Sequence, residues 1–385
     1  MMPSFFQHLK NITILKISMI IVIGGIALAL LNRYHYFLWA TFNECFVRQE
    51  FALPAPGKEL IIRNEGVGLP RALKRIVAFA FPEYKIVYKE DALSPHLIIT
   101  SYYGQSEEAL AQQQVQAPYF TLSGENKSVR WRRFRATGYP FAEFISRKKE
   151  TDNFIFLPFF LYAYPSLKEI LVRTIQNKPK GAIKNKQVAY IASDCTPERE
   201  GIFHALKAKL GADQAIGMGQ CSTTPGCRAP GGYGNLDHIL KDYNFVIAAE
   251  NRNYKGYVTE KIINAYKVGA VPIYWGDAST VREFFNPDSF IDATSYQSFE
   301  ELAEDVKTLV QNPKELEKKL RAPLFKDNKI PSFLLINEEK LSPDAEKILK
   351  ERGRHFRKLY DEYVQERKNR KAYWKALDWS WESLS

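Results

Sequence analysis

The stretch NFVIAAENRNYKGYVTEKIINAYKVGAVPIYWG, residues 244–276, decides the fold that this sequence predicts. It begins with an apolar run of strand length, 245–249, which stops at a polar pair. A polar loop follows, and apolar residues at helical spacing then begin after Thr259 and end near Gly269. A second apolar run, 270–275, closes the stretch. The order strand, loop, helix and strand predicts a parallel βαβ unit.

Polar residues follow the first of these strands. Ligands of open parallel sheets bind beyond the carboxyl ends of the strands, and Glu250 and Asn251 lie at that edge. A helix N-terminus carries partial positive charge and unpaired N–H groups, so it suits a phosphate. Lys261 adds a cation in the first turn, where the helix dipole does not favour one, which indicates an anionic ligand. The alternative, equally weighted by spacing alone, is that Glu260 and Lys261 are solvated first-turn residues.

The residues 250–276, together with FFNPDSFID at 284–292, resemble the donor-binding motif of the α-1,3-fucosyltransferases, glycosyltransferase family 10, and most closely its bacterial members. The Y-V-T-E-K core of that motif is matched at 257–261. These enzymes transfer L-fucose from GDP-β-L-fucose to a sugar hydroxyl with inversion. The resemblance implies an α/β protein of the GT-B fold class, in which two Rossmann-like domains face each other across the active-site cleft. It also implies a GlcNAc-type hydroxyl of a glycan as acceptor, with α-1,3 or α-1,4 linkage left open.

Length and charge agree with an enzyme of this kind. At 385 residues the chain can form two ordinary domains with extensions. Its formal net charge of +11 would suit nucleic acid, an anionic membrane or a phosphorylated small ligand. No helix-turn-helix, zinc-finger or RNA-binding signature accompanies the charge, so nucleic acid is not expected as a partner.

The sequence has four cysteines, Cys45, Cys195, Cys221 and Cys227. Cys221 and Cys227 could close a small loop in an oxidising compartment. A zinc site that combines them with His204 or His238 matches no standard ligand spacing. We therefore expect unpaired thiols or this one local disulfide, and no metal site.

An apolar run at 12–31 is just long enough to span a bilayer. No small-residue cleavage site follows it, and the aromatic residues of 34–39 are typical of an interfacial belt. The sequence therefore predicts an uncleaved signal anchor within residues 1–35, followed by a stem at 36–57. A buried N-terminal helix is the alternative. We expect a single-pass membrane protein that lies in a Golgi-type or a bacterial membrane.

The next part of the chain predicts an α/β domain over 58–180. Strand-like runs at 58–63, 85–88 and 96–100 alternate with a helix-like segment at 71–81. Later in the same domain, the aromatic stretch FIFLPFFLYAY is too short to span a membrane and predicts core or interdomain packing.

A further apolar run, 119–122, leads into the sequence SGEN at 123–126. A carboxylate at the end of a strand is well placed to face a cleft, although the residues alone favour an ordinary turn acid. The fucosyltransferases carry their proposed general base in a T-G-E-N segment at this place. The resemblance therefore implies that Glu125 is the base.

The polar and basic sequence KPKGAIKNK at 178–186 predicts a linker, with a second α/β domain over 187–340. Its first strand, 187–192, precedes a helix that holds Arg199 in its first turn. A guanidinium suits a bidentate phosphate contact, although position alone favours an exposed helix arginine. The family pattern P-x-R-x-x-x-[FY]-x-A-L is matched here, which implies that Arg199 contacts the diphosphate.

The remaining residues, 341–385, form a basic and aromatic tail for which the sequence predicts a long helix. Two interpretations have equal weight. The helix either lies on a membrane surface as an amphipathic element or packs back on the first domain.

Taken together, the resemblance implies a division of roles. Glu125 removes the proton of the acceptor hydroxyl, while Arg199 and Lys261 stabilise the departing diphosphate. Glu260 suits the ribose hydroxyls, and Asn251 could read the guanine. The residues expected to bind the nucleotide sugar are Arg199, Glu250, Asn251, Tyr257, Glu260 and Lys261.

No D-x-D triad occurs in the chain, so we expect no required cofactor and at most a stimulatory divalent metal. Two rival functions remain. One is transfer from a different nucleotide sugar by the same fold. The other is a non-catalytic, membrane-anchored protein that binds glycans or polyanions through its basic tail.

Overall fold

The computed structural model describes residues 52–65, 68–101, 117–124, 142–146, 154–164, 166–176, 183–221 and 236–382. The expected signal anchor at 12–31 and the expected base, Glu125, lie outside these ranges. Within them, no helix combines the length and the apolar character that crossing a bilayer requires.

In the described residues, the first half of the chain forms six parallel strands in the order β2-β1-β3-β4-β5-β6. The strands are β1 (Glu59–Glu65), β2 (Lys85–Lys89), β3 (Leu97–Ser101), β4 (Tyr119–Ser123), β5 (Ala142–Ile145) and β6 (Phe154–Phe156). The first four coincide with predicted apolar runs. β3 and β4 are buried along their whole length, which explains why their sequences are nearly continuous in apolar residues. β5 and β6 were not predicted as strands, because three or four residues carry too little periodicity.

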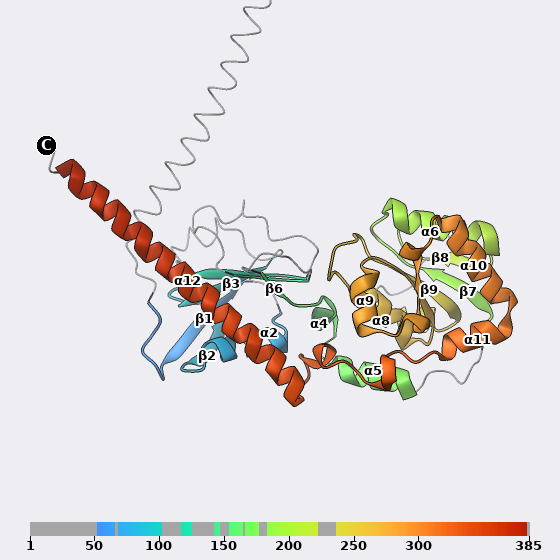
Figure 1. Cartoon of the computed structure of the whole chain (residues 1–385), viewed down its shortest axis with the longest axis horizontal. Helices are drawn as coiled ribbons and strands as arrows, with labels where there is room; N and C mark the ends of the chain where they lie inside the picture. The colour runs from blue at the N-terminus through green and yellow to red at the C-terminus, as the bar shows by residue number, and fades with distance from the viewer. Residues whose placement is uncertain are drawn as a thin grey trace, which may run out of the picture.

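Two helices cover this sheet from far-separated parts of the sequence. α2 (Arg71–Ala80) buries one apolar stripe and packs against α12 (Pro343–Glu382). The Phe356 ring of α12 lies 5.0 Å from Phe120 and 5.1 Å from Phe144, on strands β4 and β5. Gly353 permits the approach, since a Cβ there would lie 2.6 Å from the Cβ of Phe79. The first half of α12 is therefore part of the protein core, and its far end extends beyond the sheet (Figure 1).

The second half forms five parallel strands, counted in the described residues, in the order β11-β10-β9-β7-β8. They are β7 (Lys186–Tyr190), β8 (Ala215–Gly217), β9 (Tyr243–Ala249), β10 (Val271–Trp275) and β11 (Ile291–Asp292). α8 (Glu260–Lys267) connects β9 to β10, and Ala249 pairs with Trp275 where both strands end. The predicted βαβ unit is confirmed.

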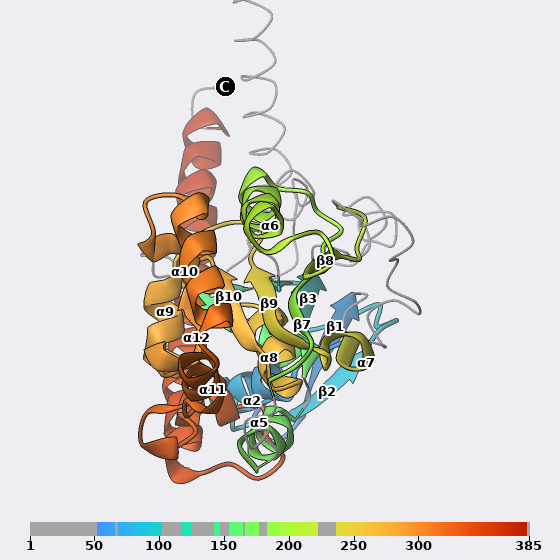
Figure 2. The same cartoon turned by 90° about the vertical axis from the view of Figure 1, so that its right-hand side faces the viewer.

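Helices cover both faces of this second sheet (Figure 2). The alternation of β9 explains this, because Phe245 and Ile247 face one layer while Val246 and Ala248 face the other. The first layer contains α6 (Pro197–Leu210), α10 (Phe299–Gln311) and α11 (Pro313–Arg321). The second contains α7 (Leu236–Leu240), α8 and α9 (Ala278–Phe284).

Aromatic side chains join the two sheets, which lie side by side with α4 (Phe160–Ala163) between them (Figure 1). Phe156 of β6 stacks on Phe333 of η6 (Ser332–Leu335), with ring centroids 5.6 Å apart. Phe333 also stacks on Phe284 of α9 at 5.2 Å. Tyr164 donates a hydrogen bond to the Oδ1 atom of Asn264 in α8, just before α5 (Leu167–Gln176) begins. The aromatic stretch at 154–164 therefore packs between domains, as predicted.

Cys221 forms a disulfide with Cys195, not with Cys227. The expected pairing was wrong because β7 and β8 are neighbours in the sheet, which brings the residues that follow them together across 26 positions of sequence. The sulfur of Cys221 is therefore not available as a thiolate ligand for zinc.

Candidate functional site

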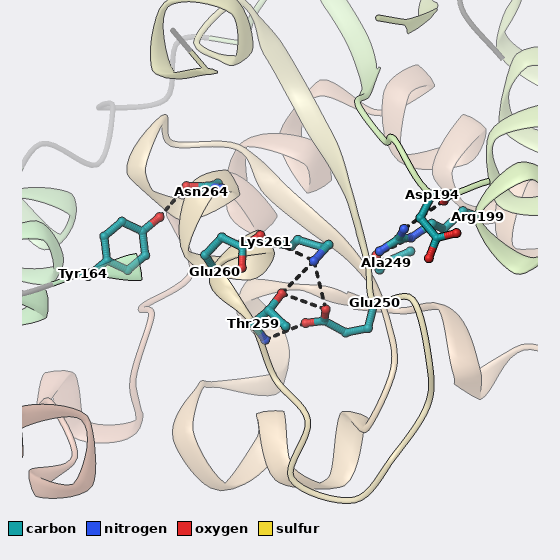
Figure 3. A network of polar contacts seen from close by, with 9 residues as sticks. All are labelled: Tyr164, Asp194, Arg199, Ala249, Glu250, Thr259, Glu260, Lys261 and Asn264. Carbon is teal, nitrogen blue, oxygen red and sulfur yellow. Dashed lines mark hydrogen bonds and ion pairs between the residues drawn. The ribbon is translucent and has the colours of Figure 1, made fainter. Parts of the chain in front are cut away.

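The candidate site lies at the carboxyl edge of β7 and β9. These strands are parallel neighbours, so the segments that follow Tyr190 and Ala249 meet at one edge of the sheet. α6 begins shortly after β7, and α8 begins shortly after β9. Figure 3 shows the side chains that these elements bring together.

Arg199 is held in place by the backbone. Its helix begins with Thr196 as N-cap and a proline at the first position, so the residue falls in the first turn. The Nε atom donates to the Ala249 carbonyl and Nη1 donates to the Asp194 carbonyl, both at 2.9 Å. Only 4% of the residue is exposed, so it is not the exposed helix arginine of the alternative interpretation. Two of the five N–H groups of a guanidinium are thereby used, and Nη2 meets no acceptor among the described residues.

Glu250 is completely buried at the end of β9. Its Oε1 atom accepts a hydrogen bond from the Thr259 backbone N–H, and its Oε2 atom accepts one from the Thr259 hydroxyl, both at 2.7 Å. Burial raises the pKa of this carboxyl, and the charge of Lys261 with the bonds from Thr259 opposes the rise. Glu250 was expected to line the ligand site, but in this conformation it presents no surface to a ligand.

Lys261 faces the site from the first turn of α8. Its Nζ atom lies 3.3 Å from Glu250 Oε2 and 3.5 Å from Glu260 Oε1, and it donates to the Thr259 hydroxyl at 2.9 Å. Burial lowers the pKa of Lys261, but the carboxylates of Glu250 and Glu260 outweigh burial and raise it above its ordinary value. The Lys261 side chain is 29% exposed, so part of this tethered and charged side chain reaches the solvent.

The N-terminus of α8 adds to this positive region. Thr259 is the N-cap residue, but its hydroxyl donates to Glu250 and its side chain caps no N–H group of the helix. The first-turn N–H groups are therefore left for another acceptor. The charge of Arg199 also acts on Lys261, in the direction of a lower pKa, so the two cations are close enough to interact.

The other predicted site residues are Tyr257, Asn251, Glu260 and Glu125. Tyr257 is 2% exposed, and its backbone N–H donates to the Tyr254 carbonyl at 2.9 Å. Asn251 is partly exposed at the start of the loop. The Glu260 side chain is 21% exposed, and its Oε2 atom has no hydrogen-bond partner within the structure described. Glu125 follows β4 of the other sheet, outside the described residues.

Sequence reasoning missed Asp277, which fixes the loop between β9 and α8. Its Oδ2 atom accepts a hydrogen bond from the Gly256 N–H at 2.7 Å, and Oδ1 accepts one from the Thr280 N–H at 3.3 Å. It thus caps α9 and holds the loop at the same time. The sequence GDAST after an apolar strand was the available signal, since aspartate is a preferred N-cap.

Gly276 was also missed. A Cβ at this position would lie 2.7 Å from the Tyr274 hydroxyl and 2.9 Å from Glu250 Cγ, and its φ of 153° is one that side chains rarely adopt. Glycine is therefore required where β10 passes the buried carboxylate.

In the parts of the chain that the structure describes, no three His, Cys, Asp or Glu side chains are grouped as metal ligands would be.

Two parallel sheets, with cations gathered at the carboxyl edge of the second, define a two-domain α/β protein of the GT-B class. Residues 182–321 match the family model "Glycosyltransferase family 10 (fucosyltransferase) C-term". This part of the chain is therefore similar to the C-terminal domain of the family 10 glycosyltransferases.

Curated relatives each match between a third and two fifths of the chain. The Alpha-(1,3)-fucosyltransferase FucT of Helicobacter pylori is 32% identical over 136 residues, which are 35% of this chain and 27% of the relative. The Alpha-(1,4)-fucosyltransferase of Arabidopsis thaliana is 34% identical over 140 residues, 33% of this chain and 34% of the relative. The GDP-fucose protein O-fucosyltransferase 3 of Gallus gallus is 30% identical over 161 residues, 40% of this chain and 33% of the relative. The chain thus aligns with about a third or less of each.

Solved structures extend the likeness to both sheets. A crystal structure of an α1,3-fucosyltransferase superposes with a TM-score of 0.50 at 21% identity, covering 72% of this chain and 85% of that one. A crystal structure of an α1,3-fucosyltransferase with GDP-fucose gives 0.50 at 20% identity, covering 80% and 95%. This likeness shows a shared fold.

Proposed function

We propose that this protein is an inverting fucosyltransferase that moves L-fucose from GDP-β-L-fucose to a GlcNAc-type hydroxyl of a glycan, in α-1,3 linkage. The observation that carries the proposal is the placement of Arg199 and Lys261 at the carboxyl edge of neighbouring strands. The family 10 domain and the names of its relatives support the choice of donor. An α-1,4 linkage, as in the name of the Arabidopsis relative, is the variant that product analysis must distinguish.

The donor half of the reaction needs cations near the leaving group. The Nη2 edge of Arg199 and the ammonium of Lys261 would hold the diphosphate, with the first-turn N–H groups of α8 as further donors. Both cations are fixed before the substrate arrives, so they stabilise the developing negative charge without reorganising. Glu260 would bind the ribose hydroxyls, Asn251 would read the guanine, and Tyr257 would shape the pocket wall. No metal cofactor is required in this scheme.

The acceptor half needs a base on the opposite side of the sugar. Glu125 is the proposed base, because it directly follows Gly124 at the carboxyl end of β4. Gly124 itself is packed against aromatic side chains, since an added Cβ would lie 3.3 Å from the Phe159 ring and 3.6 Å from the Tyr162 ring. A base on the first sheet and a leaving group on the second fit an in-line displacement with inversion. The apolar run at 12–31 would anchor the enzyme in a membrane.

A donor-selection assay tests the proposal. Purified protein is incubated with labelled GDP-fucose, GDP-mannose or UDP-sugars and with a glycan array as acceptor, and products are mapped for linkage. We expect transfer from GDP-fucose, and on the order of 10²–10³-fold less for Lys261→Met. Lys267→Met, which loses an ion pair with Asp237 and a contact with the Tyr164 ring at the other end of α8, is the matched control and keeps full activity. Preferential transfer from another donor, or none from any donor, would refute the proposal.

A further inference from the structure

We propose that Glu250 is a positioning residue: its buried carboxylate holds Lys261 and Thr259 so that the ammonium and the uncapped first turn of α8 face one diphosphate. The inference rests on the proposed function, which it extends to a residue that does not itself touch the substrate. It also replaces the expectation that Glu250 belongs to the ligand-binding surface.

The first argument is burial. Glu250 is 0% exposed, and both of its oxygens are engaged by Thr259 and Lys261. A carboxylate with no accessible surface cannot bind a nucleotide without leaving these partners. Burying a carboxylate costs free energy unless it is paired and hydrogen-bonded. The role of Glu250 is therefore to be sought in what it does to its partners, Thr259 and Lys261.

The second argument is the direction of the hydrogen bonds (Figure 3). The Thr259 hydroxyl donates to Glu250 and accepts from Lys261 Nζ. The hydroxyl is turned toward Glu250, and it accepts no hydrogen bond from an N–H group of α8. One carboxylate therefore has two effects: it fixes the ammonium and it keeps the first-turn N–H groups available to an anion.

The third argument is charge. Three charged groups act on Lys261, one from each element around it: Glu250 after β9, Glu260 in α8 and Arg199 in α6. The two carboxylates raise the pKa of Lys261, whereas burial and Arg199 lower it. Removal of the Glu250 charge should therefore lower that pKa, and the binding of an anion should weaken as the pH rises in the alkaline range.

A double-mutant cycle tests whether Glu250 acts through Lys261. GDP affinity is measured by calorimetry for the full chain, Glu250→Gln, Lys261→Met and the double variant. By analogy with residues that orient metal ligands, we expect Glu250→Gln to weaken GDP binding on the order of 10–100-fold. The same change should weaken GDP binding by a clearly smaller factor when Lys261 is already methionine, because only the effect through Thr259 then remains. An equal loss in both backgrounds would overturn the inference.

A matched control separates positioning from stability. Asn244, at the opposite end of β9, is also fully buried and bonds through its side chain to Lys184 and Gln187. Asn244→Ala should lower stability yet leave GDP affinity and its dependence on alkaline pH unchanged. Glu250→Gln should shift that dependence to lower pH. Glu250→Asp, which retains the charge and serves if the glutamine variant does not fold, should restore the wild-type profile. An unchanged profile in Glu250→Gln contradicts the inference.

A measurement of GDP binding also distinguishes a failure of this inference from a failure of the proposed function. Wild-type protein that binds GDP but transfers no fucose would defeat the proposed function, while the cycle would still decide the role of Glu250.

Discussion

The Nε atom of Arg199 donates a 2.9 Å hydrogen bond to the carbonyl oxygen of Ala249, so a guanidinium carried by α6 is attached to the last residue of β9. This bond links the two segments that supply the cations of the site. Nη1 is bound to the Asp194 carbonyl, so within the described part of the chain Nη2 is the nitrogen of the guanidinium that remains for a ligand.

Arg199→Lys should impair the donor reaction although it keeps the charge. A lysine has no planar fork that could hold two backbone carbonyls and contact a diphosphate at once. We expect kcat/KM for GDP-fucose to fall on the order of 10²–10³-fold, or about 2–4 kcal/mol of transition-state stabilisation. Arg321→Lys, in an exposed pair with Glu317 on α11, is the control and should have no effect. Full activity of Arg199→Lys would exclude a specific role for the guanidinium.

Gly276→Ala should disturb the site by displacing the buried side chain of Glu250. The new methyl group would press on Glu250 Cγ and the Tyr274 hydroxyl, at 2.9 and 2.7 Å, with a backbone angle unfavourable for alanine. We expect a loss of roughly 1–3 kcal/mol in unfolding free energy, together with weaker GDP binding. Gly68→Ala meets no atom within 4 Å and should be nearly neutral in urea titrations. If both variants behave alike, the close approach at Gly276 has no energetic consequence.

Lys184 should make stability depend on alkaline pH. Its Nζ atom donates to the carbonyls of Tyr243 and Val268, and burial lowers its pKa from 10.5 to about 8, with Asp242 opposing the shift. The folded state therefore binds the proton less tightly than the unfolded state. The unfolded state carries more protons between about pH 8 and 10.5, so stability rises with pH in that window.

Chemical denaturation of wild type and Lys184→Met at several pH values checks this effect. The stability of wild type relative to the variant should increase between pH 8 and 10.5, by up to about 3 kcal/mol and by less where solvent screens the charge. A difference that stays constant from pH 7 to 10.5 would show that the pKa of Lys184 is not lowered.

Gly353→Ala should loosen the tail helix. Helix propensity alone favours alanine by roughly 1 kcal/mol. The contact with α2 opposes this gain, because the added Cβ would lie 2.6 Å from Phe79 Cβ and 3.0 Å from its backbone carbonyl carbon. We expect a net loss of about 1–3 kcal/mol in the unfolding free energy. Glu351→Ala, on the exposed side of the same turn, should be close to neutral. A more stable Gly353→Ala would mean that α12 does not pack closely here.

Loss of the disulfide should weaken both the fold and the site. Closing a loop across 26 residues contributes about 3.5 kcal/mol in the chain-entropy account. Cys195 adjoins Asp194, whose carbonyl binds Arg199, so Cys221→Ser should also reduce GDP affinity. Cys227→Ser is the control and should change neither quantity. Equal effects of the two serine variants would contradict the Cys195–Cys221 pairing.

The sequence by itself determined the βαβ unit and the location of the candidate site. Apolar runs of strand length and a helical period are local signals, and the residues that follow a parallel strand must lie at its carboxyl edge. Position alone did not single out Arg199 or Lys261, and the resemblance to family 10 selected both. The structure places each of them in the first turn of a helix after such a strand.

Only the tertiary structure decided how these residues are held. The burial of Glu250, the bond from Asp277 to Gly256 and the pairing of Cys195 with Cys221 depend on the strand order and on the closest approach of the backbones. The tail is the clearest example. Its basic and aromatic composition is compatible with a membrane surface or a protein core, and only the contact of Phe356 with β4 and β5 assigns that part of α12 to the core. Contacts between segments more than 200 residues apart leave no periodic trace in a single sequence.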